Sequence, residues 1–280
     1  MRKTVFITGC SSGIGAALAR EFHARGLAVI ASARRVESLA ALADTGIRAL
    51  AVDVNDDAGI AAAMRAVGEE YGTIDILVNN AGYSQVGAVI DLTREDLRRQ
   101  YETNVIAPVM VTRAAIGLLR AARERHGAAL VVNVGSIVGL LATPFAAAYC
   151  SSKAALHSLS DALRMELAPF GIRVITLQPG GVKSSFGDHA EGNLRLPADS
   201  LYRPVANGIH ARARAGQVGA TPTEAFVRPV VDALLRQRPP LVIRGGKNSV
   251  LLPLLKKVLP TPAFDGRLSK AFGLDRLGRG

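Results

Sequence analysis

The chain has no tryptophan among its 280 residues, and aromatic side chains make up only 5% of it. With so few aromatic residues and no recognised nucleic-acid-binding module, we expect no nucleic-acid partner. Cysteine is equally scarce, since only Cys10 and Cys150 occur, and we expect them to be reduced rather than joined. No spacing of cysteine and histidine resembles a metal site, so we expect no metal.

Long apolar runs are also lacking, although hydrophobic residues make up 49% of the chain. Because no run of about 18 uncharged apolar residues occurs, we expect no membrane-spanning helix. The first strand pattern begins at residue 3, which leaves no room for a signal peptide. We therefore expect a cytoplasmic protein.

Strand and helix patterns alternate along the chain, and this order predicts an α/β fold. We expect a single doubly wound parallel sheet flanked by helices, and 280 residues suffice for an ample core. Two long helices are predicted near 93–122 and 149–168. The predicted strands cover residues 3–8, 28–33, 47–52, 74–79, 129–135, 172–178 and 241–244.

A glycine-rich turn, residues 8–15, joins the first predicted strand to the first helical pattern. Glycine allows a tight turn and lets a ligand approach the backbone closely. The N-terminus of the following helix offers N–H groups and a favourable dipole to a pyrophosphate. The turn therefore predicts a dinucleotide site, and a glycine-rich turn without a ligand is the alternative.

Tyr149 and Lys153 lie four residues apart, and Ser136 precedes the tyrosine by thirteen positions. Residues with this spacing share one face of a helix, so the ammonium can lie beside the phenol. A positive charge favours the phenolate, and we expect Lys153 to lower the pKa of Tyr149. The three side chains predict proton transfer to or from a carbonyl oxygen that Ser136 holds. A half-exposed helix with a solvated lysine is the alternative.

In these motifs and their order, the chain resembles the short-chain dehydrogenase/reductase family over roughly residues 1–245. The matching positions are 8–15, 79–82, Asn104, Ser136, Tyr149, Lys153 and 179–180. One position departs from the family pattern, because Ser184 stands where a threonine is usual, although it keeps a hydroxyl. The resemblance is strongest to the branch of 17β-hydroxysteroid dehydrogenases and acyl-dihydroxyacetone-phosphate reductases. It implies a Rossmann-type catalytic domain over 1–245.

The resemblance also implies the reaction, which interconverts a ketone or aldehyde and an alcohol by hydride transfer. It assigns catalysis to Ser136, Tyr149, Lys153 and Asn104, with Asn104 holding a water that links Lys153 to solvent. For Asn104, a bend or a satisfied backbone in its helix is the alternative. The cofactor contacts that we expect are Gly9, Ser11, Ser12, Gly13, Ile14, Gly15, Arg34, Arg35, Asp53, Val54, Asn80, Ala81, Gly82, Tyr149, Lys153, Pro179, Gly180, Val182 and Ser184.

Arg34 and Arg35 follow the second predicted strand, where an acidic residue would select NAD. A guanidinium pairs with a 2′-phosphate instead, so we expect NADP(H) as the cofactor. Arg34 is the expected main contact, with Ser32 or Ser11 adding a hydroxyl. One or both arginines could instead be solvated, and Asp53 could be a helix cap rather than a neighbour of the adenine.

The segment 183–222 is expected to form a helical lid over the substrate. The loop 139–145 and the segment 83–86 are expected to form two further walls of the pocket. An apolar pocket favours a steroid-, retinoid- or acyl-lipid-like substrate. The lid side chains expected to cover it are Phe186, His189, Leu194, Leu196, Tyr202, Val205 and Ile209.

Positive charge is concentrated at the end of the chain, whose net charge is +11. From residue 236 onward there are ten lysines and arginines against two aspartates. The extension 246–280 also contains the apolar run 250–255, so it is predicted to be a basic amphipathic segment. We expect its leucines to close the substrate pocket or a subunit interface, with the lysines solvated. A helix that lies on an anionic membrane surface is the alternative.

The resemblance implies a homodimer or homotetramer that pairs through the long helices near 93–122 and 149–168. A non-catalytic redox sensor that binds NADP(H) on the same fold is the alternative function. Such a sensor needs the glycine turn but no proton relay, and this chain keeps all four catalytic positions, which favours an enzyme.

Overall fold

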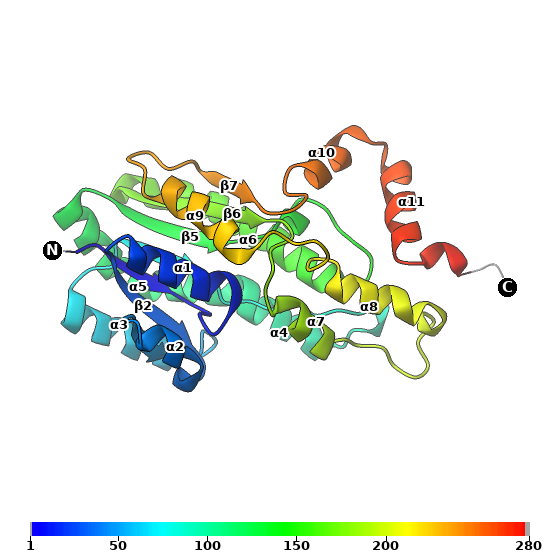
Figure 1. Cartoon of the computed structure of the whole chain (residues 1–280), viewed down its shortest axis with the longest axis horizontal. Coiled ribbons are helices and arrows are strands. Elements are labelled where there is room, and N and C mark those ends of the chain that lie inside the picture. Colours follow the sequence, from blue (N-terminus) through cyan, green and yellow to red (C-terminus); the bar gives the residue numbers. More distant parts are fainter. Residues whose placement is uncertain (1, 278–280) are drawn as a thin grey trace.

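Seven parallel strands form one sheet in the computed structural model, which describes residues 2–277 (Figure 1). Their order across the sheet is β3-β2-β1-β4-β5-β6-β7, with every neighbouring pair parallel. All seven predicted strands are present, and their ends differ from the predicted ends by at most two residues. The strands are β1 (Thr4–Ile7), β2 (Ala28–Ala33), β3 (Arg48–Ala51), β4 (Ile76–Asn79), β5 (Ala129–Val134), β6 (Ile172–Pro179) and β7 (Val242–Gly245).

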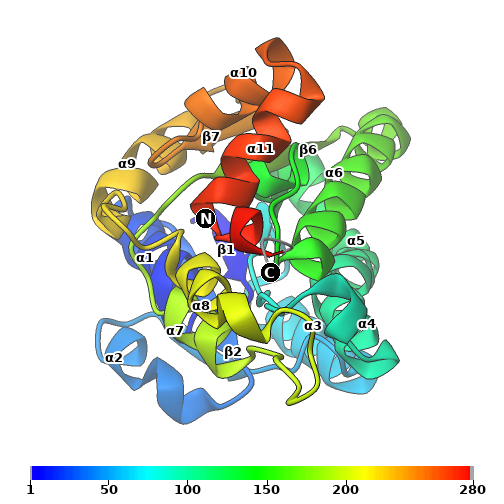
Figure 2. The same cartoon turned by 90° about the vertical axis from the view of Figure 1, so that its right-hand side faces the viewer.

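Helices cover both faces of this sheet, as the end-on view shows (Figure 2). One face carries α1 (Gly13–Ala24), α2 (Ala40–Ala43) and α9 (Thr223–Leu234). The other face carries α3 (Asp57–Tyr71), α5 (Ala107–His126) and α6 (Ala147–Leu167). This arrangement is the doubly wound sheet that the alternating sequence pattern predicts.

The central strands β1, β4 and β5 are buried along their whole length because helices cover both faces of the sheet. Successive side chains point to opposite faces, so β1 sends Val5 and Ile7 to the core under α1 and α9. Phe6, between them, packs in the core under α3 and α5. These two cores fix the strands so that their carboxyl ends share one edge, where the polar motif residues follow.

A long helical segment begins at α4 (Arg94–Tyr101), passes through a π-helical turn, Glu102–Ile106, and continues as α5. By length and composition alone, one helical segment among the described residues, 94–126, is long and apolar enough to cross a membrane, although the sequence contains no uncharged apolar run of 18 residues. The buried side chains of α5, including Val111, Ala115 and Leu119, pack in the core of the sheet.

A helical lid lies beyond the carboxyl ends of the strands, within the predicted segment 183–222. It contains α7 (Phe186–Gly192) and α8 (Ala206–Arg214), and a single bridge joins Leu194 to Val86 on the opposite wall. Val205 and Ile209 are the centre of a third apolar cluster that also includes Phe145 from the loop before α6. The lid therefore has a core of its own.

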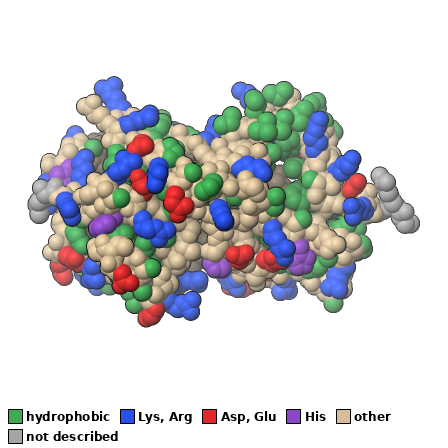
Figure 3. All heavy atoms as spheres, in the orientation of Figure 1, with side chains coloured by type: hydrophobic (Ala, Val, Ile, Leu, Met, Phe, Trp, Pro, Cys, Tyr) green, Lys and Arg blue, Asp and Glu red, His purple; other side chains and the backbone are tan. Residues whose placement is uncertain are grey.

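The C-terminal extension forms two helices, α10 (Leu251–Val258) and α11 (Thr261–Ala271), directly after β7. Its last turns return to the lid, where Phe272 and Leu274 pack against the third cluster. The surface view shows hydrophobic side chains gathered over α10, with lysines and arginines nearby (Figure 3). The extension thus touches the lid at one end and presents an apolar face to solvent at the other.

Candidate active site

A cleft of about 1210 Å³ opens at the carboxyl edge of the sheet, under the lid and the extension. Its walls come from the glycine turn, the ends of β4 to β6, the start of α6, the lid and the C-terminal helices. A pocket for one small ligand has a volume of roughly 300–1,000 Å³, so this cleft has room for a dinucleotide and a substrate.

The glycine turn leaves no space for side chains. Gly9 has a φ of 71°, and a Cβ atom there would lie 2.7 Å from the Cα atom of Ala81. Gly13 has a φ of 60°, and its Cβ would lie 3.0 Å from Cβ of Ser184. A Cβ on Gly15 would lie 2.5 Å from the carbonyl oxygen of Gly9. Only glycine fits these three positions, which gives a ligand direct access to the backbone.

The N-terminus of α1 faces this cleft without a cap of its own. Ser12 is the N-cap residue, but its hydroxyl makes no capping hydrogen bond and instead pairs with the hydroxyl of Ser185 at 2.7 Å. The first turn contains no acidic residue, and both Gly13 and Ile14 line the cleft. Because such an N-terminus attracts anions, these residues fit the pyrophosphate of a dinucleotide.

The segment after β4 is bonded to the glycine turn. Asn80 donates from its side-chain amide to the carbonyl oxygens of Thr8, at 2.8 Å, and Gly9, at 2.9 Å. In return, the Thr8 hydroxyl accepts hydrogen bonds from the backbone N–H groups of Asn80 and Ala81, both at 3.0 Å. Two motifs that are 70 residues apart in sequence therefore form one rigid wall of the cleft.

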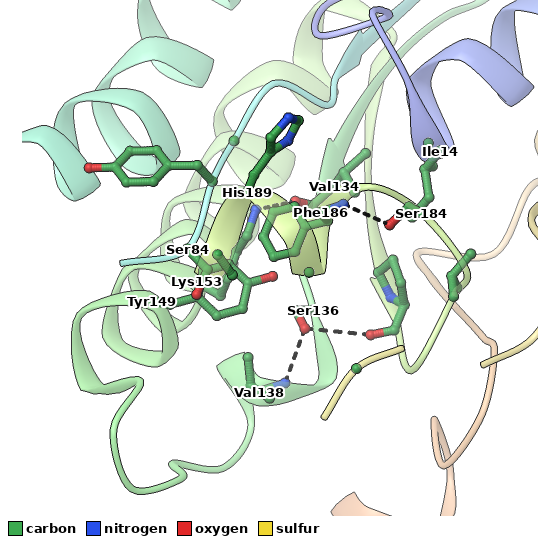
Figure 4. A pocket seen from close by; sticks show the side chains of 18 of the residues that line it. Ile14, Ser84, Val134, Ser136, Val138, Tyr149, Lys153, Ser184, Phe186 and His189 are labelled. Carbon is green, nitrogen blue, oxygen red and sulfur yellow. Dashed lines mark hydrogen bonds between the residues drawn. The ribbon is translucent and has the colours of Figure 1, made fainter. Parts of the chain in front are cut away.

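Ser136, Tyr149 and Lys153 meet on the opposite wall (Figure 4). Ser136 follows β5, and its hydroxyl accepts a hydrogen bond from the backbone N–H of Val138 at 3.3 Å. Tyr149 and Lys153 lie one turn apart on α6, with the ammonium 5.9 Å from the centre of the phenol ring. The ammonium donates to the carbonyl oxygen of Val134 at 2.7 Å. The geometry therefore brings the three predicted catalytic side chains together.

The expectation that Lys153 lowers the pKa of Tyr149 is wrong for this structure. Burial raises the pKa of Tyr149 to about 12, and a hydrogen bond from Ser136 opposes that rise only in part. Burial also lowers the pKa of Lys153, to about 8. The cost of removing a phenolate from water exceeds the stabilisation that it receives from Ser136 and from the charge of Arg212. The ammonium of Lys153 is bonded to Val134 instead.

Asn104 lies outside the lining of the cleft, in the π-helical turn. Its side chain accepts a hydrogen bond from the backbone N–H of Tyr83 at 3.1 Å and donates to the carbonyl oxygen of Tyr83 at 3.0 Å. It also donates to the hydroxyl of Ser152, on α6, at 3.1 Å. The side chain thus joins the wall at residue 83 to the catalytic helix, and its water-binding role stays a prediction.

The two arginines after β2 differ in position. Both are exposed, but only Arg34 lines the cleft. Ser32 is fully buried and donates to a backbone carbonyl, so it is wrong as a phosphate contact. Asp53 also lines the cleft, and α3 is capped by Asp56, which removes the alternative that Asp53 is the helix cap.

Among the expected cofactor contacts, Gly15 and Arg35 are the two that do not line the cleft. Gly15 is buried beneath the turn, where it allows the close packing described above. The expected contacts that do line the cleft are Gly9, Ser11, Ser12, Gly13, Ile14, Arg34, Asp53, Val54, Asn80, Ala81, Gly82, Tyr149, Lys153, Pro179, Gly180, Val182 and Ser184.

The lid side of the cleft is more polar than expected. Of the apolar lid side chains expected to cover the substrate, only Phe186, whose ring centre lies 5.5 Å from that of Tyr149, reaches the lining. His189 reaches it as well. From the loop 139–145, only Thr143 does so. The other lid residues turn inward to the third apolar cluster, because the lid needs a core of its own: Leu194, Leu196, Tyr202, Val205 and Ile209.

Several residues that line the cleft were not predicted from the sequence. They come from the lid and the C-terminal extension, where no motif marks them and only the fold brings them to the cleft. Three apolar ones, Leu252, Leu268 and Phe272, belong to the C-terminal extension. The extension therefore closes part of the pocket, which was one of the two roles considered for it from the sequence. The residues are Arg212, Gln217, Lys247, Asn248, Leu252, Leu268 and Phe272.

A dinucleotide cradle and a Ser–Tyr–Lys group on one doubly wound sheet are the arrangement of an oxidoreductase that uses a nicotinamide cofactor. The family model for short chain dehydrogenases matches residues 3–193, and the chain belongs to this family. The predictions of family and fold are therefore confirmed.

Three known proteins illustrate the similarity. An NADPH-dependent 1-acyldihydroxyacetone phosphate reductase of Schizosaccharomyces pombe is 37% identical over 280 residues, covering 96% of this chain and 87% of that protein. A short-chain dehydrogenase from Streptomyces avermitilis is 30% identical, with a TM-score of 0.80 and coverage of 100% and 99%. A family member from Burkholderia phymatum, solved with NAD, shares the fold at 24% identity, a TM-score of 0.77 and coverage of 91% and 93%.

Proposed function

We propose that this protein is an NADP(H)-dependent oxidoreductase that interconverts a ketone or aldehyde and an alcohol on a largely apolar, steroid-, retinoid- or acyl-lipid-like substrate. The observation that carries the proposal is the meeting of Ser136, Tyr149 and Lys153 in the cleft that the glycine turn also lines. The relative from Schizosaccharomyces pombe, whose name gives an acyl-lipid ketone as its substrate, supports the substrate class.

The residues of the cleft suit the reductive direction. When bound, NADPH supplies hydride to the carbonyl carbon. Ser136 donates a hydrogen bond to the carbonyl oxygen, where negative charge develops. The raised pKa of Tyr149 keeps the phenol protonated at neutral pH, so it can donate a proton to that oxygen. Lys153, whose pKa of about 8 is close to neutrality, can then return a proton to the tyrosine.

Arg34 supports NADP(H) over NAD(H), because its guanidinium reaches the cleft at the end of β2. The expected partner is the 2′-phosphate of the cofactor. Replacing Arg34 with glutamate should reverse the preference between NADPH and NADH in kcat/KM. Replacing its exposed neighbour Arg35 with glutamate changes the net charge equally and should leave the preference as it is. An unchanged ratio in the Arg34→Glu variant would remove Arg34 from the phosphate site.

Tyr149→Phe tests the catalytic proposal. NADPH oxidation should be followed with steroid ketones, retinal, acyl-dihydroxyacetone phosphate and small ketones. The variant should bind NADPH normally and lose roughly 10²- to 10⁴-fold in kcat, which is the usual contribution of a general acid. Tyr202→Phe removes a hydroxyl outside the lining and should keep full activity.

Two outcomes would contradict this proposal. Turnover by Tyr149→Phe within about tenfold of the wild type would show that another group donates the proton. Binding of NADPH by the wild type without turnover of any carbonyl compound would favour the alternative, a non-catalytic redox sensor.

A further inference from the structure

Arg212 is a buried cation in the wall of the cleft. It belongs to α8, lines the cleft and is only 9% exposed. Its Nε atom donates a hydrogen bond to the hydroxyl of Thr143 at 2.7 Å. Within residues 2–277, no carboxylate lies within 4.0 Å of its guanidinium. Burial removes the hydration of a charge, so a buried arginine is normally paired.

The neighbouring lid arginines lack this property. Arg214, two residues further along α8, is 64% exposed in its side chain and pairs with Glu191. Arg195 is also exposed and faces Asp96 at 4.0 Å. Glu191 and Asp96 thus lie near exposed arginines, and the hydrogen-bond partner of the Arg212 guanidinium within residues 2–277 is the hydroxyl of Thr143.

The position of Arg212 is close to the reacting groups. Thr143, which holds its Nε atom, lies in the loop between Ser136 and Tyr149. The charge of Arg212 acts to lower the pKa of Tyr149, which places the guanidinium within electrostatic reach of the phenol. With Nε engaged, the two terminal nitrogens remain to form the parallel hydrogen bonds that guanidinium makes to carboxylate or phosphate.

We propose that Arg212 binds an anionic oxygen group, a carboxylate or a phosphate, that the substrate carries in addition to its carbonyl and its apolar part. This assignment rests on the proposed function and narrows its substrate class from largely apolar ketones and aldehydes to amphiphilic ones that carry an anionic group. It accounts for the unpaired buried charge, and it agrees with a substrate side that is more polar than the lid sequence suggests.

Binding can be measured without turnover. Dodecanoate, dodecyl phosphate and dodecanol share one chain and differ in the head group, so each should be titrated calorimetrically into enzyme saturated with NADP⁺. We expect the wild type to bind one of the anions about 10- to 100-fold more tightly than dodecanol, the usual effect of a hydrogen bond to a charged group. The better of the two anions identifies the head group.

Variants of Arg212 and of its neighbour Arg214 test whether Arg212 causes this preference for an anionic head group. Arg212→Met should abolish it, Arg212→Lys should keep part of it, and Arg214→Met, on the same helix, should keep all of it. Equal binding of anions and alcohol by the wild type would overturn the assignment. So would a loss of NADP⁺ affinity in Arg212→Met, since that would show that the arginine binds the cofactor instead.

Turnover then separates this inference from the function on which it rests. Arg212→Met should lower kcat/KM for 3-oxododecanoate roughly 10- to 100-fold more than it lowers kcat/KM for the methyl ester of this acid. An equal loss on acid and ester would make Arg212 a structural support of the lid and overturn the assignment. Selective anion binding without turnover of any ketone would support the assignment and overturn the oxidoreductase proposal.

Discussion

His157 holds the segment that carries Ser136. Its Nε2 atom accepts a hydrogen bond from the backbone N–H of Ser136 at 3.4 Å, and its Nδ1 atom is buried without a partner within residues 2–277. The ring fills the space beside Gly135 and Gly139, where a Cβ atom would overlap it. A charged imidazole is disfavoured there, because burial and the charge of Lys153 lower the pKa of His157 to about 4.

This pKa predicts a loss of stability in acid. An imidazole has a pKa of 6.5 when unfolded, so between pH 6.5 and 4 the unfolded chain binds more protons than the folded chain. The free energy of unfolding should therefore decrease as the pH is lowered from 6.5 to 4, by on the order of 3 kcal/mol in total. Urea denaturation of the wild type and His157→Gln at several pH values measures it. The variant should show a smaller decrease, and parallel curves would rule out His157 as the cause.

Single residues were predictable where a motif fixes both identity and spacing. Ser136, Tyr149 and Lys153 are of this kind, because a strand end and one helix turn bring them together. Their pKa values were not predictable, since burial outweighs the pair interaction. Arg212 was missed for another reason. Its proposed role as an anion site depends on its burial without a carboxylate beside it, and only the folded structure shows where the carboxylates lie.

Among the structural elements, the turn between β1 and α1 restricts the allowed residue types most, because several of its positions accept only glycine. Gly9→Ala would place a methyl group 2.7 Å from the backbone of Ala81 at a φ of 71°, so the turn must shift. The expected result is weaker NADPH binding and a loss of stability of about 1–3 kcal/mol.

Gly117→Ala is the matched control on the exposed side of α5, where a Cβ meets nothing within 4 Å. It should raise stability by roughly 0.5–1 kcal/mol and leave NADPH binding unchanged. Calorimetric unfolding and NADPH titration of both variants test the pair. Equal behaviour of the two alanines would show that the turn tolerates a side chain.

The strands were predictable because runs buried on both faces are apolar throughout and end at polar motif residues. The π-helical turn at Glu102–Ile106 was not, although the possible bend at Asn104 was recognised. Its form depends on hydrogen bonds from Asn104 to Tyr83 and Ser152, which come from other elements. The prediction that the apolar side chains of the lid cover the substrate was wrong for most of them for a related reason. A sequence pattern cannot distinguish a side chain that faces a ligand from one that packs in a small separate core.

At the scale of the whole molecule, the C-terminal extension has two faces. Leu252 and Leu268 line the cleft, so part of its apolar content closes the pocket. Val250, Leu254 and Val258 lie on the outside of α10 and are exposed, next to lysines and arginines (Figure 3). The two alternatives considered from the sequence are therefore compatible, because the side chains that line the cleft differ from those that are exposed on the outside. Assembly into a homodimer or homotetramer stays a prediction.

We propose that the outer face of α10 lies on an anionic membrane surface. Exposed leucine and valine side chains can enter the lipid interface while Lys256 and Lys257, in the last turn of α10, approach acidic headgroups. The protein should sediment with vesicles that contain phosphatidylserine, less so at high salt, and not with pure phosphatidylcholine. Such binding would place the cleft mouth, where Leu252 lies, near a source of amphiphilic substrate.

Two double variants separate membrane binding from a general charge effect. Lys256→Glu with Lys257→Glu should weaken partitioning at least about tenfold, because each cation near the surface contributes to it. Arg236→Glu with Arg238→Glu makes the same change in net charge away from α10 and should retain most of the binding. If both pairs weaken binding equally, attraction by the whole basic protein is sufficient. If neither pair weakens binding, or if the wild type does not bind anionic vesicles, the membrane proposal is wrong.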